Sequence, residues 1–132
     1  IFVDALKNLD IKFAWIVNSD DGLDEISPYS KTTVFQLKDN IVSEIIIDPK
    51  ELNVGADNLE ELIGNDAKYN ADKMIQIFKG EDNDFSKAVC LNTAAGLIVS
   101  GSQKNYTDAY NNAREHILSG KVAKHMEKIQ NG

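Results

Sequence analysis

This sequence of 132 residues has little cysteine and no long apolar run. Each of these features excludes some classes of protein. The single cysteine, Cys90, excludes an internal disulfide and fits a reducing compartment, so we expect a cytoplasmic protein. No apolar run approaches the roughly 18–20 residues that a membrane-spanning helix needs. The longest candidate, residues 88–99, is interrupted by Asn92 and Thr93 and is predicted to be a buried helix, so we expect no membrane partner.

Positive charge is also in short supply. The sequence has 14 lysine and arginine residues against 21 aspartate and glutamate residues, which gives a net charge of -7. Nucleic-acid-binding proteins concentrate positive charge to displace the counterions of phosphates. The only cationic cluster, formed by Lys121, Lys124 and Lys128, is interleaved with Glu127. We therefore expect no nucleic-acid partner.

The sequence has neither an initial methionine nor a signal peptide, and it begins at Ile1 with residues spaced as in a helix. We therefore expect a fragment, and any targeting signal would lie upstream. Internal repeats and low-complexity segments are absent, and the length suits one compact domain with a real core. The predicted organisation is a single domain over residues 1–132.

The first part of the sequence predicts a helix followed by a buried strand. Residues 1–9 place apolar side chains on one side of a helix, and residues 11–17 form an apolar run rich in strand formers. A nearly continuous apolar strand is typical of a sheet that is covered on both faces. A helix leading into such a strand indicates the α/β class.

A β-hairpin is predicted next. Residues 32–38 and 41–47 alternate between their two faces, and Asp39 and Asn40 between them tolerate the positive φ of a tight turn. Pro49 then ends the second strand, because proline cannot donate a hydrogen bond to the ladder.

Helices are predicted from Asp66 to the end of the sequence. Gly80 fits the end of the first helix, and Asp84 is a suitable N-cap for a second over residues 85–100. This second helix is apolar nearly all round and should therefore be central. Asn105 is suited to cap the third. The later helices should bury an apolar stripe: Ala109, Ala113, Ile117, Val122, Met126 and Ile129.

An acidic segment directly after the buried strand carries the chemistry that the residues themselves suggest. Asp20, Asp21, Asp24 and Glu25 place four carboxylates within six residues, and these repel one another unless a cation or hydrogen-bond donors compensate. Ligand sites in open α/β sheets lie beyond the carboxyl ends of strands. Hard oxygen ligands favour magnesium, calcium or manganese, and magnesium is often shared between one or two carboxylates and substrate phosphates. The alternative is a solvated turn or a helix cap, and the spacing is not that of an EF-hand.

Residues 21–27 read Asp-Gly-Leu-Asp-Glu-Ile-Ser and match the DGLDEIS signature of anthranilate phosphoribosyltransferases at every position. The similarity continues through Pro28 and the predicted hairpin. Residues 64–71 then resemble the family's GGDAxxNA segment, and residues 91–95 resemble its LNAAA helix. The resemblance runs in order through the chain, over about the last two-fifths of a typical member.

The resemblance implies a fold, an activity and a metal site. The fold would be the C-terminal portion of the α/β domain of the nucleoside phosphorylase and phosphoribosyltransferase type, with sheet strands and a hairpin packed against C-terminal helices. Members transfer phosphoribosyl from phosphoribosyl pyrophosphate to anthranilate in tryptophan biosynthesis, and are homodimers through an N-terminal helical domain. Asp24 and Glu25 would bind the magnesium that accompanies the pyrophosphate. No catalytic residue is expected in this fragment, and its substrate-binding residues stay undetermined.

The chain departs from the family pattern in two ways. Asn18 and Ser19 stand where members have His-Gly. The glycine-rich phosphate loop, the Lys-His-Gly-Asn segment and the arginine that meets the carboxylate of anthranilate are absent, since in the family they lie upstream. We therefore expect the fragment alone to be inactive. Two alternatives stay open: a related phosphoribosyltransferase or nucleoside phosphorylase with another acceptor, and a non-catalytic relative that binds nucleic acid or protein.

Other chemically capable residues are predicted to be structural. Cys90 lies on the most apolar helix and should be a buried thiol. Two histidines are expected on solvated helix faces, and three aromatic residues in the core or a packing stripe. Asp66 and Asn70 are expected to cap and pack a helix. The histidines and aromatic residues concerned are His116, His125, Trp15, Tyr106 and Tyr110.

Overall fold

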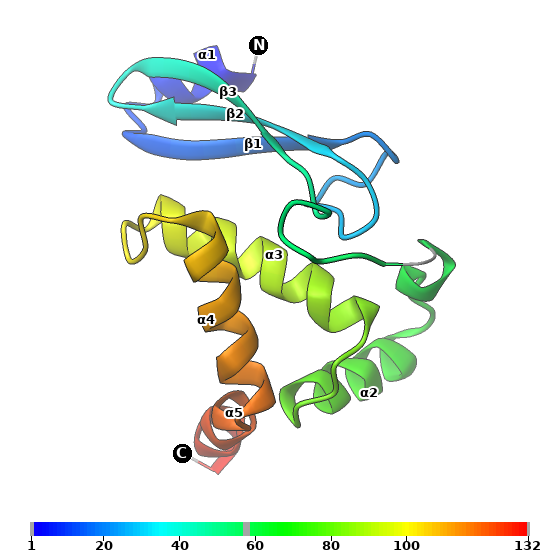
Figure 1. Cartoon of the computed structure of the whole chain (residues 1–132). Coiled ribbons are helices and arrows are strands. Elements are labelled where there is room, and N and C mark those ends of the chain that lie inside the picture. Colours follow the sequence, from blue (N-terminus) through cyan, green and yellow to red (C-terminus); the bar gives the residue numbers. More distant parts are fainter. Residues whose placement is uncertain (1, 57–58, 132) are drawn as a thin grey trace.

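The computed structural model describes residues 2–56 and 59–131, without the side chain of Glu61. Its first part is a three-stranded antiparallel sheet in the order β1-β2-β3. A short helix, α1 (Phe2–Asn8), precedes the strands β1 (Phe13–Ser19), β2 (Thr32–Lys38) and β3 (Ile41–Ile47). Figure 1 shows α3 crossing one side of the sheet, with α1 on the other side.

The predicted hairpin is confirmed, and its turn shows why the sequence specifies it. Asp39 and Asn40 have φ values of 48° and 65°. Positive φ at both central residues is the requirement of a type I′ turn, whose twist matches that of the flanking strands. Val34 of β2 therefore pairs with Ile45 of β3, and on its other side it pairs with Val17 of β1. The last strand ends at Ile47, before the predicted break at Pro49.

The first strand begins two residues later than predicted. Asp10 has a φ of 57°, and the amide of Ile11 donates to the carbonyl of Leu6 at 3.1 Å. This is the left-handed cap that closes a helix, so the residues between Asn8 and Ile11 form the turn that ends α1 and are not part of the strand. Ile1, which the helix was also predicted to include, lies outside the described residues.

The two faces of the sheet differ in how well they are covered. Phe13, Trp15 and Val17 point with Val34 toward the main core, whereas the opposite face contacts α1 over only part of its area. Phe35 on that second face is 37% exposed and Ile46 is 52% exposed. The prediction that both faces of β1 are covered is therefore fulfilled only in part among the described residues.

In the described residues after the sheet, the structure has four helices and a 3-10 turn (η1, Leu59–Leu62). They are α2 (Ala67–Phe78), α3 (Asp84–Val99), α4 (Tyr106–Leu118) and α5 (Lys121–Asn131). Asp66 and Asn105 cap α2 and α4, as predicted. The predicted cap of α3 is wrong by one residue: Asn83 takes that position because it exchanges hydrogen bonds with Ser86 in a capping box.

The helix α3 is central, as its apolar composition predicted. Leu91 and Ala94 are fully buried, and they join Ala109, Ala113 and Ile117 of α4 in the main hydrophobic core. The core also includes Val34 and Ile47 of the sheet, so both parts of the molecule share one apolar cluster. The predicted stripe ends early, since Ile129 of α5 is 62% exposed. In the described part of the chain, no helix is long and apolar enough to cross a membrane.

Candidate functional site

The acidic segment forms a loop between β1 and β2 that is tied together by Asp21 and Ser27. The carboxylate of Asp21 accepts hydrogen bonds from the hydroxyl of Ser27 at 2.5 Å and from the amide of Leu23 at 3.1 Å. The same hydroxyl accepts from the amides of Tyr29 at 2.9 Å and Ser30 at 3.1 Å. Ser27 is fully buried, so these bonds form inside the loop and fix its path.

The environment of Asp21 stabilises its charged form. Burial acts to raise the pKa of this carboxyl, but hydrogen bonds from Ser27, Leu23, Ser19 and Ser30 lower it further than burial raises it. The net result is a pKa below the ordinary value of 3.8. Hydrogen-bond donors within the loop therefore stabilise the negative charge of Asp21, and this carboxylate helps to hold the loop together.

Asp24 and Glu25 of this loop are exposed. Among the described residues, Asp24 has no hydrogen-bond or ion-pair partner, and Glu25 has only a 3.4 Å contact from the side chain of Asn92. The structure thus distinguishes Asp21 from the other three predicted carboxylates, since Asp20 is exposed like Asp24 and Glu25. Asp21 holds the loop, whereas Asp24 and Glu25 leave their oxygens available to a ligand.

The residue that follows the acidic pair is anchored in the core. Ile26 is 1% exposed and belongs to the main apolar cluster. Its amide donates to the side-chain oxygen of Asn92 on α3 at 2.9 Å, and its carbonyl accepts from the side-chain nitrogen of Asn92 at 3.1 Å. The exposed carboxylates therefore stand next to a fixed point of the backbone.

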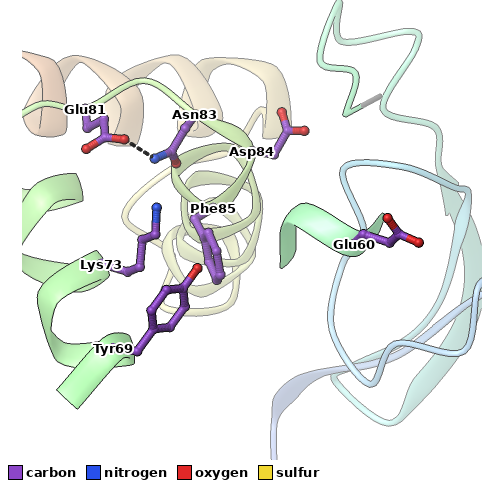
Figure 2. A pocket seen from close by; sticks show the side chains of 7 residues that line it. All are labelled: Glu60, Tyr69, Lys73, Glu81, Asn83, Asp84 and Phe85. Atoms are coloured by element: carbon purple, nitrogen blue, oxygen red, sulfur yellow. Dashed lines mark hydrogen bonds between the residues drawn. The ribbon is translucent and has the colours of Figure 1, made fainter. Parts of the chain in front are cut away.

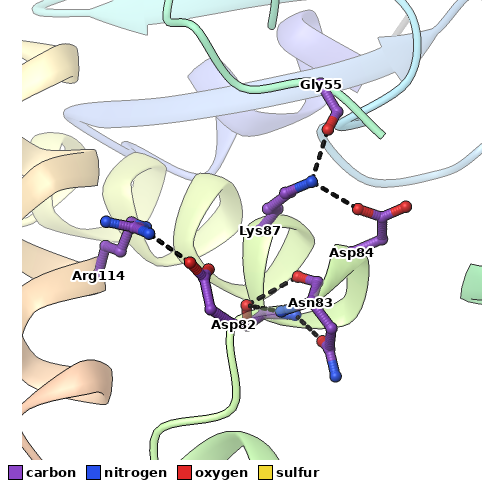
Figure 3. Close-up of polar contacts among 7 residues, drawn as sticks. Gly55, Asp82, Asn83, Asp84, Lys87 and Arg114 are labelled. Atoms are coloured by element: carbon purple, nitrogen blue, oxygen red, sulfur yellow. Dashed lines mark hydrogen bonds and ion pairs between the residues drawn. The ribbon is translucent and has the colours of Figure 1, made fainter. Parts of the chain in front are cut away.

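A second set of contacts, drawn in Figure 3, ties α3 to the segment that follows the hairpin. Lys87 donates to the carbonyl of Gly55 at 2.6 Å and to Asp84 at 2.7 Å. The amide of Ala56, next to Gly55, donates to the carbonyl of Pro28 at 3.0 Å. Lys87 is 29% exposed in this ion pair, so water screens it less than a surface pair. The acidic loop is thus held from α3 at Ile26 and, through this segment, at Pro28.

The positions that depart from the family pattern lie at the start of the loop. Asn18 is exposed, whereas Ser19 is 3% exposed and its hydroxyl lies 3.0 Å from that of Ser30. Asn70 is exposed, and its side chain bonds the backbone of Asn65 just before α2. The role of Asn92 was not predicted. Its signal in the sequence was a polar residue at the centre of the most apolar helix.

The cysteine, the aromatic residues and the histidines lie where the sequence predicted them, in the core or on exposed helix faces. Burial raises the pKa of the Cys90 thiol to about 11, which makes it a poor nucleophile. Tyr106 donates to the carbonyl of Leu91 at 2.8 Å and its ring lies 5.7 Å from that of Trp15. Burial likewise raises the pKa of the Tyr110 phenol to about 12. His116 and His125 are exposed.

A polar cavity of about 380 Å³ lies elsewhere, between η1, α2 and the start of α3. Figure 2 shows Lys73 and Tyr69 from α2 on one side of it, with Glu81 and Asn83 bonded to each other at 2.8 Å. Asp24 and Glu25 do not line it. The available carboxylates are therefore on the loop surface, away from this cavity.

The chemistry of the loop fits a hard divalent cation that is only partly held by the protein. Among the described residues, no group of three or more histidine, cysteine, aspartate or glutamate side chains could enclose a metal ion. Two adjacent carboxylates are what magnesium uses when water and substrate phosphates supply its other ligands. The residues of the loop therefore do not form a closed structural metal site, and their chemistry fits a cation that takes its remaining ligands from water or a phosphate.

Comparison with known proteins places the chain in a family. Residues 2–123 match the model of the glycosyl transferase family, a/b domain, and the chain belongs to that family. It is 69% identical to the anthranilate phosphoribosyltransferase of Pelagibacter ubique over 99% of its own length and 40% of that protein. It is 36% identical to the Syntrophomonas wolfei enzyme of the same name, over 95% of the chain and 37% of that protein. The chain therefore spans about two-fifths of the length of these relatives.

Solved structures confirm the predicted α/β fold. The anthranilate phosphoribosyltransferase of Thermus thermophilus superposes with a TM-score of 0.83 at 24% identity, over 96% of this chain and 37% of that one. The Saccharomyces cerevisiae enzyme, solved in complex with phosphoribosyl pyrophosphate and magnesium, gives a TM-score of 0.81 at 24% identity, over 96% of this chain and 36% of that one. The sheet, hairpin and C-terminal helices thus correspond to a part of this enzyme fold.

Proposed function

We propose that this chain is the C-terminal part of the α/β domain of an anthranilate phosphoribosyltransferase. The observation that carries the proposal is the loop at residues 20–28, where Asp24 and Glu25 are exposed beside a backbone that Asn92 fixes at Ile26. Relatives that are 69% and 36% identical to the chain bear that name, which supports the same activity for the protein to which this chain belongs. Its homodimeric assembly stays a prediction from the resemblance, and its cytoplasmic location stays a prediction from its single cysteine.

Asp24 and Glu25 are proposed to hold magnesium together with the pyrophosphate group of the substrate. Their exposed, adjacent carboxylates are hard oxygen donors, and Asp24 has no competing partner in the described part of the chain. When bound, magnesium would neutralise the charge that grows on pyrophosphate as it leaves. The S. cerevisiae structure in complex with phosphoribosyl pyrophosphate and magnesium supports this assignment by analogy.

The residues of this chain have a binding and orienting role in that reaction. Asp21 and Ser27 close the loop by hydrogen bonds, so the acidic pair is held in place before the ligand arrives. A preorganised site loses less entropy on binding than a flexible one. No side chain of this chain is proposed as a catalytic acid, base or nucleophile. Contacts to the ribose and to the acceptor are expected from the rest of the longer protein.

A related phosphoribosyltransferase or a nucleoside phosphorylase is the second candidate, because the matching family model describes glycosyl transfer in general. The acceptor distinguishes the two. We expect the full-length protein to consume anthranilate when phosphoribosyl pyrophosphate and magnesium are present, measured as loss of anthranilate fluorescence. Phosphorolysis of a pyrimidine nucleoside with no effect on anthranilate would instead support the second candidate.

A further inference from the structure

We propose that Asn92 is a positioning residue that holds the acidic loop in the geometry needed for Asp24 and Glu25 to bind a metal–pyrophosphate ligand. The inference rests on the proposed function of that pair. Asn92 lies near the middle of α3, and it is 66 residues from Ile26 in the sequence. Its amide makes four contacts, and three of them reach the acidic loop: the Ile26 amide, the Ile26 carbonyl and the Glu25 carboxylate.

The hydrogen-bond partners determine which way the Asn92 amide faces. The Ile26 amide can only donate, so it must meet the side-chain oxygen, at 2.9 Å. The side-chain nitrogen then donates to the carbonyls of Ile26 at 3.1 Å and Ala88 at 3.0 Å. Because both backbone groups of one residue are engaged, the peptide planes on either side of Ile26 are fixed. One of these planes joins Ile26 to Glu25.

The helix that carries Asn92, α3, is held firmly enough to fix the position of the acidic loop. Its neighbours Leu91 and Ala94 on α3 are 0% exposed, so the helix is seated in the main core. Side chains locked by packing and by further hydrogen bonds are what hold a binding constellation in place. The bond from Asn92 to the Ala88 carbonyl also fixes its own side chain to the helix.

The neutrality of the Asn92 side chain is part of the proposed role. Its side-chain nitrogen lies 3.4 Å from Glu25, close enough to orient that carboxylate. A neutral amide does this without neutralising the negative charge, whereas a lysine there would form an ion pair and compete with a cation. Lys87 on the same helix is engaged by Asp84 and Gly55 instead. The acidic pair therefore keeps its charge for the ligand.

The test uses the full-length protein that contains this chain, with magnesium and inorganic pyrophosphate as the probe. Asn92→Ala removes every contact of the amide. Asn92→Asp keeps the size of the side chain but loses its donor and places a negative charge beside Glu25. Thr93→Ala, an exposed neighbour on α3, is the matched control. We expect magnesium pyrophosphate to bind at least tenfold more weakly to both Asn92 variants in isothermal titration calorimetry, and within twofold of wild type to the control.

A second readout is independent of the metal. Hydrogen exchange at the Ile26 amide should accelerate at least tenfold in Asn92→Ala, while exchange at the Leu91 and Ala94 amides stays as in the wild type. Unchanged exchange at Ile26 would overturn the proposed contact. Faster exchange with wild-type binding of magnesium pyrophosphate to Asn92→Ala would overturn the positioning role.

The double variant Asp24→Asn with Glu25→Gln separates this inference from the proposed function. If that variant binds magnesium pyrophosphate like the wild type, the metal assignment is wrong and the positioning role falls with it. If that variant loses binding while Asn92→Ala retains it, the metal assignment stands and only the role of Asn92 is refuted.

Discussion

Single hydroxyl and amide groups determine the conformation of the acidic loop. The hydroxyl of Ser27 donates to Asp21 and accepts from two backbone amides, and Ser27 has no exposed surface. Removing such a group leaves buried donors without partners, which costs more than the hydrogen bond gains. The same logic applies to Asn92 and the backbone of Ile26. At this scale, the loop depends on a few buried polar side chains and not on the exposed carboxylates that it presents.

Ser27→Ala should therefore lower the free energy of unfolding by about 1–3 kcal/mol, because two loop amides and one carboxylate lose their partner. Thr107→Ala, an exposed position in the first turn of α4, is the control and should change stability by no more than about 0.5 kcal/mol. Urea denaturation followed by circular dichroism measures both. Equal stability of the two variants would contradict the role given to Ser27.

Asp21 should also make stability depend on pH. Its pKa is lower in the folded protein than the ordinary value of 3.8, so the unfolded chain binds the proton more tightly. The contribution of Asp21 is therefore present above that value and is lost as the pH falls through the lower folded pKa. Asp21→Asn should show a shallower loss of stability between about pH 5 and pH 2 than the wild type. Thermal unfolding across that range measures this dependence, with Asp20→Asn as the control. Parallel plots of stability against pH for Asp21→Asn and the wild type would contradict this role of Asp21.

At the scale of elements, local chemistry was readable in the sequence and long-range contacts were not. The hairpin was predictable because Asp39 and Asn40 carry their own turn preference. The cap of α3 was missed by one residue, because Asn83 and Asp84 are both good caps and the choice depends on the reciprocal bond to Ser86. Contacts such as Asn92 with Ile26 could not be inferred, since nothing local links residues so far apart in the sequence.

The hairpin turn offers a direct test at this scale. Asn40 has a φ of 65°, a conformation that disfavours a β-branched side chain and costs about 1–2 kcal/mol. Asn40→Val should lower the unfolding free energy by about that amount, whereas Asn40→Gly should be tolerated because glycine adopts positive φ readily. Differential scanning calorimetry measures the stability of both variants. Equal stability of the valine and glycine variants would contradict the turn assignment.

At the scale of the whole molecule, the chain folds around the loop that we propose to bind magnesium, but it spans only part of the length of its relatives. Its sheet and helices share one core, yet the chain spans only 40% of its 69% identical relative. DGLDEIS located the acidic pair, and the structure adds which carboxylates are available: Asp21 is engaged in the loop, whereas Asp24 and Glu25 are exposed. The resemblance singled out Asp24 and Glu25, but the residue types alone could not separate them from Asp21, because these three differ only in the partners that the fold provides.

The isolated chain should not turn over substrate, since two carboxylates cannot also position a ribose and an aromatic acceptor. The purified 132-residue chain should leave anthranilate fluorescence unchanged with phosphoribosyl pyrophosphate and magnesium. The full-length protein, assayed in parallel, is the positive control. Turnover by the isolated chain above the no-enzyme rate would show that the site is complete without the rest of the protein.

The most direct test of the central claim is the magnesium dependence of that reaction in the full-length protein. Asp24→Asn with Glu25→Gln should lower activity at least tenfold, equivalent to about 1.4 kcal/mol of transition-state stabilisation, and should raise the magnesium concentration at half-maximal rate. Asp20→Asn, an exposed acidic residue of the same loop, is the control and should match the wild type. A double variant with wild-type activity and an unchanged magnesium requirement would contradict the assignment of Asp24 and Glu25 as the metal-binding pair.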